Sequence, residues 1–189
     1  MISEDFVIPT WVRIEDGATE TYARFAVEPF ERGYGTTVGN SMRRVLLASL
    51  SGAAVTAVRF ENITHEFSAI PGVQEDLTAV VLNLKQCELS MTDGESIIFT
   101  HVFKGIGELT AGDLFASQDK AVCHNPDHVL LTSTSKDTKL ELEIKVVRGR
   151  GYVTADKFEL DHAPLGTVYL DANFSPITKV NFLVEDARV

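Results

Sequence analysis

The segment from Glu28 to Leu50 constrains the fold more than any other part of the chain. It reads Glu-Pro-Phe-Glu-Arg-Gly-Tyr-Gly-Thr-Thr-Val-Gly-Asn-Ser-Met-Arg-Arg-Val-Leu-Leu-Ala-Ser-Leu. Successive residues of a helix are about 100° apart, so apolar side chains at positions i, i+4, i+7 and i+8 share one stripe. We therefore predict an amphipathic helix over residues 35–50. Its apolar stripe consists of Val38, Met42, Val45, Leu46 and Leu50.

The same helix carries a second, mixed face. Arg43 falls on the flank of the apolar stripe, whereas Arg44 projects to the opposite side, beside Asn40 and Leu47. A helix with contact-forming side chains on both faces suits an assembly, in which each face is covered by a different neighbour. Periodicity alone leaves the alternative open, which is a core helix with two solvated arginines.

The glycines of this segment have a competing interpretation. Gly33, Gly35 and Gly39 open a helix after an extended run, as in the loop of a dinucleotide-binding fold. This interpretation makes the chain a nucleotide-binding enzyme. The first strand of such a fold is buried on both faces and leads directly into its glycines. Here Arg24 interrupts the extended run and residues 28–32 separate it from Gly33, which disfavours the nucleotide interpretation.

The charge balance limits the kinds of partner. The 189 residues include 17 lysines and arginines against 27 aspartates and glutamates, a formal net charge of −10. A protein that binds nucleic acid by itself needs a basic face to displace counterions. The composition therefore argues against a free-standing nucleic-acid binder, although it does not exclude local basic patches.

Targeting signals are not evident in the sequence. The first residues, Met-Ile-Ser-Glu-Asp-Phe, lack the apolar core of a signal peptide, and the apolar stretch over residues 77–84 is too short for a bilayer. Cys87 and Cys123 are isolated, which is typical of thiols in a reducing compartment rather than of a disulfide. We expect a cytoplasmic protein.

Alternating and β-branched runs predict several strands. A turn at Asp93-Gly94 between residues 87–91 and 96–102 indicates a hairpin. From Lys139 to Val147 apolar and charged residues alternate cleanly, and the glycines after Arg148 are expected to end that strand. Further strands are predicted at residues 6–15, 20–28, 53–60, 167–172 and 178–185.

A second helix is predicted where Leu77, Val80, Val81 and Leu84 follow helical spacing. Glu75 and Asp76 precede it, where a carboxylate favours the positive end of the helix dipole. Because these two acids are adjacent rather than facing, helix capping explains them better than acid–base catalysis.

Other candidate chemistry is weak. Cys123, His124 and His128 have a metal-like spacing, but Pro126 breaks the helix that would align the histidines. The segment Arg148-Gly-Arg150 could hold a phosphate or a partner's carboxylate, or could simply be a glycine-rich turn. We predict no catalytic residue, no metal ligand and no cofactor.

Taken together, the motifs resemble the N-terminal domain of the bacterial RNA polymerase alpha subunit. The resemblance covers nearly the whole chain, in the order of the family. It runs through residues 27–47, then Gly52-Ala-Ala-Val-Thr-Ala, His65-Glu-Phe-Ser, Gly72-Val-Gln-Glu-Asp76, Val81-Leu-Asn-Leu-Lys85, Val147-Arg-Gly-Arg-Gly-Tyr152, Leu170-Asp-Ala, Phe174-Ser-Pro and Val184-Glu-Asp-Ala-Arg-Val189.

This resemblance implies an α+β fold of two domains. Both chain ends, residues 1–51 and 171–189, would form a dimerisation domain, and a β-rich domain of residues 52–170 would be inserted into it. The implied function is that of a non-catalytic subunit, which dimerises and recruits the beta and beta-prime subunits that hold the active site. The family continues beyond the position of Val189 with a further strand and a long helix, so we expect this segment alone to dimerise weakly.

The resemblance also assigns surfaces. The face of Arg44 and the segment 65–76 would contact beta, and Lys85 with the strand around Leu170 would lie toward beta-prime. The expected beta contacts are Asn40, Arg44, Leu47, His65, Glu66, Gly72, Gln74, Glu75 and Asp76. The expected beta-prime contacts are Lys85, Arg148, Arg150, Leu170 and Asp171. The expected dimer interface is the apolar stripe of Val38, Met42, Val45, Leu46 and Leu50.

Overall fold

A computed structural model describes residues 7–61, 63, 68–158 and 163–186. The chain forms two compact units, one of residues 1–46 with 179–189 and one of residues 47–178. Helices and antiparallel strands occur together, which confirms the predicted α+β class. The predicted domain limits, after residue 51 and before residue 171, differ from these divisions by several residues, and the role of each domain stays a prediction.

The first unit contains a β-hairpin and most of a long helix. β1 (Trp11–Ile14) pairs with β2 (Phe25–Glu28) in antiparallel register, with Trp11 opposite Glu28. Both strands are shorter than predicted. α1 (Tyr34–Ala48) confirms the helix predicted over residues 35–50. The observed helix begins one residue earlier and ends two residues sooner than predicted.

The extended segment of the first unit corrects one prediction. Residues 178–186 form no strand, although their sequence alternates. Instead, Val184 lies against Gly35 and Phe182 lies against Gly39. These two side chains, two positions apart, therefore pack on a helix rather than belonging to a sheet.

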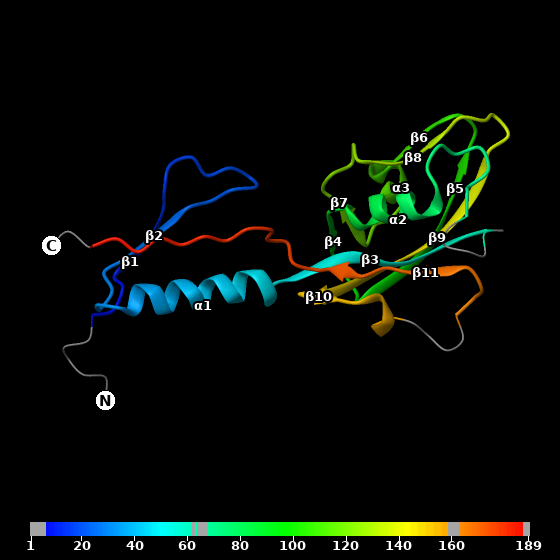
Figure 1. Cartoon of the computed structure of the whole chain (residues 1–189). Coiled ribbons are helices and arrows are strands. Elements are labelled where there is room, and N and C mark those ends of the chain that lie inside the picture. The colour runs from blue at the N-terminus through cyan, green and yellow to red at the C-terminus, as the bar shows by residue number, and fades with distance from the viewer. Residues whose placement is uncertain (1–6, 62, 64–67, 159–162, 187–189) are drawn as a thin grey trace. The chain divides into compact units, whose positions relative to one another are not determined.

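The second unit is built around an antiparallel sheet (Figure 1). Its strand order is β5–β9–β3–β4–β7, and β11 pairs with the free part of β3. The strands are β3 (Ser51–Phe60), β4 (Leu89–Met91), β5 (Ser96–Lys104), β7 (Ala121–Cys123), β9 (Lys139–Arg150) and β11 (Thr167–Tyr169).

Shorter elements complete this unit. β6 (Gly107–Thr110) pairs with β8 (Val129–Ser133), and β10 (Tyr152–Val153) pairs with β12 (Ala172–Asn173). The helices α2 (Leu77–Lys85) and α3 (Ala111–Phe115) lie on one side of the main sheet in Figure 1. A 3-10 turn, η1, spans Ala155–Lys157.

The core of the second unit lies between the main sheet and the helices. On β9, Leu140, Leu142, Ile144 and Val146 are at most 7% exposed, which confirms the predicted alternation. Leu77, Val80 and Leu84 of α2 are buried against them in the same cluster, as their helical spacing predicts. Burial of this many apolar side chains is the main stabilising term in a domain of this size.

Two predictions about the strands are wrong. β4 and β5 do not form a hairpin, because β9 and β3 lie between them in the sheet. β5 pairs with β9 along nine residues, whereas β4 is only three residues long and would give β5 a much shorter pairing. β9 also continues past Arg148 to Arg150, still paired with the start of β3, and the chain turns only at Gly151, whose φ is 63°.

Candidate functional site

The first unit has no hydrophobic core among its described residues. In residues 7–46 and 179–186 every side chain is exposed or half-buried. Phe25 is 59% exposed, Met42 51% and Val45 47%, although all three are large and apolar. Apolar patches of this extent usually mark surfaces that another polypeptide covers.

One sector of α1 is occupied within the unit. A methyl group at position 35 would lie 3.1 Å from Cγ1 of Val184, and one at position 39 would lie 2.7 Å from Cγ of Phe182. The segment 182–184 therefore passes so close to the helix that little room is left for a side chain at positions 35 and 39. Two glycines four residues apart inside a helix are the sequence signal for this close approach.

This packing argues against the nucleotide interpretation. A phosphate-binding loop leaves its glycines open to the ligand, whereas Gly35 and Gly39 are covered by apolar side chains. β2, the strand before the loop, pairs only with β1 among the described strands, and that pairing is antiparallel. The parallel buried sheet that this interpretation requires is not formed by the described residues.

The remaining predicted dimer residues are only partly covered. Val38, Leu46 and Leu50 are half-buried, while Met42 and Val45 stay exposed. α1 thus presents an open apolar strip next to the sector that the segment 182–184 occupies.

The opposite face of α1 carries the polar residues predicted to meet a partner. Arg44 and Asn40 are exposed, and Leu47 is half-buried. Arg44 forms no ion pair with any described residue. Its guanidinium group is therefore free to bind a carboxylate or carbonyl groups.

The loop before α2 is held rigidly against β8. Glu75 accepts a hydrogen bond from the Thr132 amide at 2.7 Å, and the Gln74 amide donates to the Thr132 carbonyl at 2.9 Å. Asp76 caps α2 by accepting from the Ala79 amide at 2.7 Å, as predicted. Glu75 has a different role from the predicted capping, because it joins this loop to β8.

Gly72 completes the same loop. Its φ of 78° lies in the left-handed region, and its carbonyl accepts from the Thr134 amide at 2.9 Å. Gln74 and Asp76 are exposed at the surface of this braced loop. Two further predicted contacts, His65 and Glu66, lie outside the described residues.

A polar cluster lies where the end of α2 meets the loop between β11 and β12. Lys85 forms an ion pair with Asp171, Nζ to Oδ2 at 3.1 Å, and the Ala155 amide donates to Asp171 Oδ1 at 2.9 Å. These hydrogen bonds, with a third from Tyr152, lower the pKa of Asp171, and the bond to Asp171 raises the pKa of Tyr152. Leu170, a predicted contact, is 1% exposed and belongs to the hydrophobic core of the second unit.

Tyr152 belongs to this cluster although the sequence does not predict it. It follows Gly151 in a turn, and its bond to Asp171 joins residues that are 19 positions apart. No local pattern in the sequence signals such a contact.

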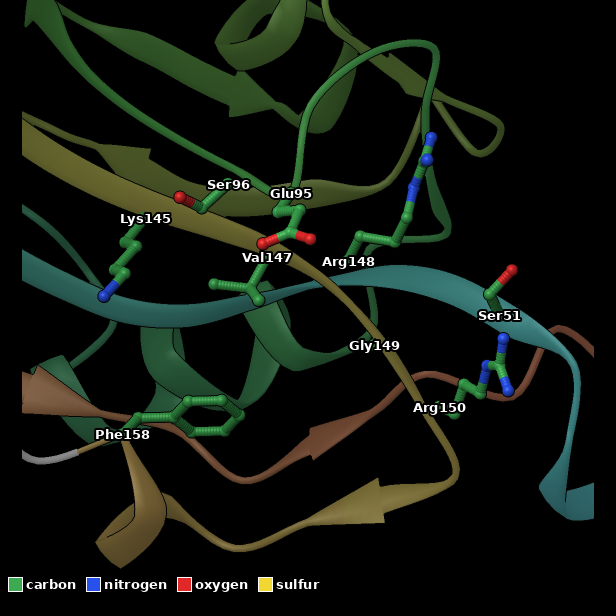
Figure 2. Close-up of a pocket in the computed structure, with 9 residues that line it drawn as sticks. All are labelled: Ser51, Glu95, Ser96, Lys145, Val147, Arg148, Gly149, Arg150 and Phe158. Atoms are coloured by element: carbon green, nitrogen blue, oxygen red, sulfur yellow. The ribbon is translucent and has the colours of Figure 1, made fainter.

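The end of β9 exposes both predicted arginines. Arg148 donates to the Met91 carbonyl across the sheet, while Arg150 forms no ion pair with any described residue. Figure 2 shows the side chain of Arg148 pointing away from Lys145, and Arg150 beside Ser51. These residues line one groove.

The side chains of Cys123, His124 and His128 each hydrogen-bond to a different residue. His124 Nε2 lies 2.8 Å from Ser90 Oγ, and His128 Nε2 lies 2.9 Å from the Asn83 carbonyl oxygen. Cys123 contacts Asn125 Oδ1 at 3.4 Å. Within the described ranges, no cluster of three metal-binding side chains occurs.

None of the helices in the described part of the chain is long and apolar enough to cross a membrane.

Comparison with known proteins gives one consistent result. The profile of the family described as RNA polymerase Rpb3/RpoA insert domain matches residues 58–175. The chain is 48% identical to the DNA-directed RNA polymerase subunit alpha of Geobacter metallireducens, over 98% of the chain and 54% of the relative. It is 50% identical to the same subunit of Heliobacterium modesticaldum (89% and 53%) and 42% identical to that of Alkaliphilus oremlandii (100% and 59%). The chain thus spans about half the length of the curated relatives it matches.

Proposed function

Since this chain belongs to the family of bacterial DNA-directed RNA polymerase alpha subunits, we propose that it is a non-catalytic scaffold of that enzyme. In this proposal it forms a dimer in the bacterial cytoplasm and recruits the beta and beta-prime subunits. The nucleotidyltransferase active site then lies on those other subunits, and this chain contributes no catalytic residue and no cofactor.

One observation carries the proposal. The described part of the first unit contains no buried side chain, although it includes exposed aromatic and aliphatic residues such as Phe25 and Val12. A unit without a core gains little stability by itself, because burial of apolar surface is the main driving force for folding. Its surface is suited to being completed by a second copy and by partner subunits.

The dimer contact in this proposal is the open strip of α1. Met42 and Val45 lie beside Val38 on the helix, and Met42 is on the side opposite Arg44. In a two-fold dimer the same strip of each copy packs against the other, so one apolar stripe is sufficient to form a self-complementary interface. Leu46 and Leu50 extend it at its C-terminal end.

The beta contact is the opposite face of α1 together with the loop before α2. Arg44 supplies a cation that forms no ion pair with any described residue, and Asn40 and Leu47 flank it. The bracing of Gly72 and Glu75 against β8 holds Gln74 and Asp76 in fixed positions, which lowers the entropy lost when a partner binds. His65 and Glu66 complete the predicted beta contacts.

The beta-prime contact is the cluster of Lys85 and Asp171, together with Arg148 and Arg150 at the end of β9. The ion pair between Lys85 and Asp171 is about two-thirds buried on each side, 32% and 35% exposed. Such a pair presents both a donor and an acceptor to a partner in a defined geometry.

Co-purification tests the proposal directly. A tagged chain, expressed with the beta and beta-prime subunits of its own organism, should retain both, and sedimentation should give a mass that includes two copies of the chain. Retention of neither subunit would refute the scaffold function. As a control for the enzyme interpretation, titration with nicotinamide and adenine nucleotides should show no binding at micromolar concentrations; binding that Gly35→Val abolishes would favour that interpretation.

A further inference from the structure

β5 forms an open edge of the main sheet. It stands first in the strand order β5–β9–β3–β4–β7, and among the described strands it pairs with β9 alone (Figure 1). All nine of its residues pair with β9 without a shift of register. The strand at the opposite end of the sheet, β7, has only three residues. β5 is therefore the longest edge strand in the described part of the chain.

The ladder with β9 determines which backbone groups of β5 point outward. Just before β5, the Glu95 carbonyl accepts from the Arg148 amide at 2.8 Å. Just after β5, the Gly105 amide donates to the Thr138 carbonyl at 2.9 Å. Hydrogen-bonded and non-bonded pairs alternate along antiparallel strands, so the odd-numbered residues of β5 bond to β9. The N–H and C=O groups of its even-numbered residues point to the open edge, and these residues are Ser96, Ile98, Thr100, Val102 and Lys104.

This edge lacks most of the usual protection against the addition of a strand. Edge strands are commonly blunted by short length, by bulges, by proline or by charged side chains. β5 contains no proline, and Lys104, its last residue, is its single lysine, arginine, aspartate or glutamate. On its outer face Ile98 is 63% exposed and Val102 44%. A long edge with exposed apolar side chains is a template on which an extended segment of another polypeptide can pair.

A groove of about 420 Å³ lies beside the first residues of this edge. Successive side chains of a strand point to opposite faces, so Ile97 borders the groove from the inner face and Ile98 from the outer face. The turn of residues 117–120 provides the other wall. An added strand is therefore bordered on two sides at this end. The lining residues are Ser96, Ile97, Ile98, Ser117, Gln118, Asp119 and Lys120.

Two lysines lie together at the other end of the edge. Lys104 stands directly opposite Lys139 in the ladder, and both are exposed. Neither forms an ion pair with any described residue. Like charges directly opposite each other on neighbouring strands are destabilising, so a carboxylate placed next to Lys104 on an added strand compensates them.

We propose that the open edge of β5 binds an extended segment of a partner polypeptide as an additional antiparallel strand. Directly opposite residues share a face of the sheet, so the partner residues opposite Ile98 and Val102 are β-branched and apolar. The partner residue opposite Lys104 is acidic. In antiparallel alignment this acid comes first, and the two apolar residues follow it by two and by six positions. β5 belongs to none of the contacts proposed above, so this surface is additional to them.

A second copy of the chain fits this edge less well. The backbone groups at the edge belong to even-numbered residues, so pairing of β5 with another β5 brings even-numbered residues opposite one another. None of these residues is acidic. In the register that aligns both strands fully, Lys104 stands opposite Ser96 of the other copy, and the two lysines stay uncompensated. Charge complementarity therefore favours a different polypeptide.

N-methylated peptides test the pairing on the purified chain. The probe is the fluorescein-labelled peptide Glu-Thr-Val-Thr-Thr-Thr-Ile-Thr-Ser, whose first residue is placed opposite Lys104, and binding is measured by fluorescence anisotropy. N-methylation of its valine removes a donor that faces β5 and should weaken binding about five- to tenfold. N-methylation of the threonine that follows the valine is the matched control. The N–H of that threonine faces away from β5, so binding should stay unchanged.

Variants of β5 test the same pairing from the side of the chain. Thr100→Pro removes an outward N–H without breaking a hydrogen bond to β9, so it should abolish most of the binding. Thr100→Val keeps that N–H and should bind normally. Lys104→Glu should weaken the glutamate peptide about two- to fivefold and strengthen a peptide that begins with lysine, whereas Lys157→Glu should change neither. Thermal melts check folding, and the N-methyl comparison on the unaltered chain is independent of how the proline is tolerated.

Several results would overturn the inference. Absence of peptide binding, or equal binding of the two N-methylated peptides, would refute strand addition at this edge. Equal binding of the glutamate and lysine peptides by the parent chain would refute the acidic position. Self-association of the chain that the peptide competes away, and that Thr100→Pro abolishes, would show that a second copy occupies the edge. Since these measurements use no polymerase subunit, their failure leaves the proposed scaffold function untouched, and loss of co-purification leaves the edge untouched.

Discussion

The ring of Phe182 lies directly over Gly39 of α1, with no space for a side chain between them. A methyl group at position 39 would lie 2.7 Å from Cγ and 2.9 Å from Cε2 of that ring. Because Cγ lies on the Cβ–Cγ bond, turning the ring about that bond does not relieve the overlap. Either the whole Phe182 side chain would have to leave this position or the backbone of the extended segment would have to move away from the helix.

Replacing the two glycines of α1 should therefore have opposite effects. Alanine in a helix interior is more favourable than glycine by up to about 1 kcal/mol. At Gly35 the facing Val184 is 51% exposed and free to shift, so Gly35→Ala should keep or raise the melting temperature. Gly39→Ala should instead lower the melting temperature and increase hydrogen exchange in residues 180–186. A rise in the melting temperature for both variants would show that Phe182 does not pack as described.

Arg44→Ala should separate folding from recruitment. Exposed substitutions usually change stability by less than about 0.5 kcal/mol, so the thermal melt should stay close to that of the parent. Truncation of a charge that is paired at an interface costs about 2–5 kcal/mol, so co-purification with beta should be lost. Arg43→Ala is the matched control; from its place on the flank of the apolar stripe we expect an effect on stability or dimerisation rather than on recruitment. An early melt of Arg44→Ala, or normal recruitment of beta, would contradict the assignment of this face.

Val45→Glu should disrupt the dimer without unfolding the chain. Val45 is 47% exposed, so a glutamate there meets water in a monomer but is buried without a partner charge in a two-fold interface. Sedimentation should therefore shift to the monomer mass. Val102→Glu serves as the control, because Val102 is similarly exposed (44%) but lies on β5 of the other unit. An unchanged dimer in Val45→Glu would place the interface elsewhere.

Asp171 should add a component to acid denaturation. Hydrogen bonds from the Ala155 amide, Lys85 and Tyr152 lower the pKa of Asp171 below its unfolded value of about 3.9. Its stabilising contribution is therefore complete above that value and is lost as the pH falls through the lower folded pKa. Between about pH 5 and 7 the melting temperatures of the parent and Asp171→Asn should run parallel, and below about pH 4 the parent should fall more steeply. Parallel curves throughout would show that Asp171 titrates normally.

The two cysteines should differ in reactivity. Burial raises the pKa of Cys87 to about 12, so at pH 8 only about one molecule in ten thousand carries the thiolate that reacts with alkylating reagents. Cys123 is only half-buried, and its pKa is also raised by burial. Iodoacetamide should therefore label Cys123 first and Cys87 only in denaturant, as measured by peptide mass spectrometry. Labelling of Cys87 at the faster rate would contradict the packing around α2.

Local patterns predicted the elements whose formation depends on near neighbours. The helical spacing at Leu77 and Leu84, the cap at Asp76 and the alternation through Leu142 all follow from residues within one or two turns or a single strand. The resemblance to the alpha-subunit family, built on motifs spread along the whole chain, is likewise confirmed by the profile match.

Pairing between distant segments was beyond the reach of the same patterns. The Asp93-Gly94 turn has the composition of a hairpin, but nothing near it indicates that β9, more than forty residues later, takes β5 as its partner. Glu75 likewise is an acidic residue at the start of a helix, where a capping residue is expected. Its carboxylate instead accepts a hydrogen bond from the Thr132 amide on β8. The burial of Leu170 and the contact of Tyr152 with Asp171 also depend on the folded second unit rather than on local sequence.

The order in which the chain is synthesised has a consequence for its first unit. Phe182 follows Gly39 by 143 residues, so α1 emerges from the ribosome long before the segment that covers its glycines. At about 5–20 residues per second, the helix waits roughly 7–30 seconds for that segment. Residues 47–178 are complete before then and can bury their own core while α1 is still uncovered. On this order of synthesis, the core of residues 47–178 can form before α1 acquires its contact with Phe182.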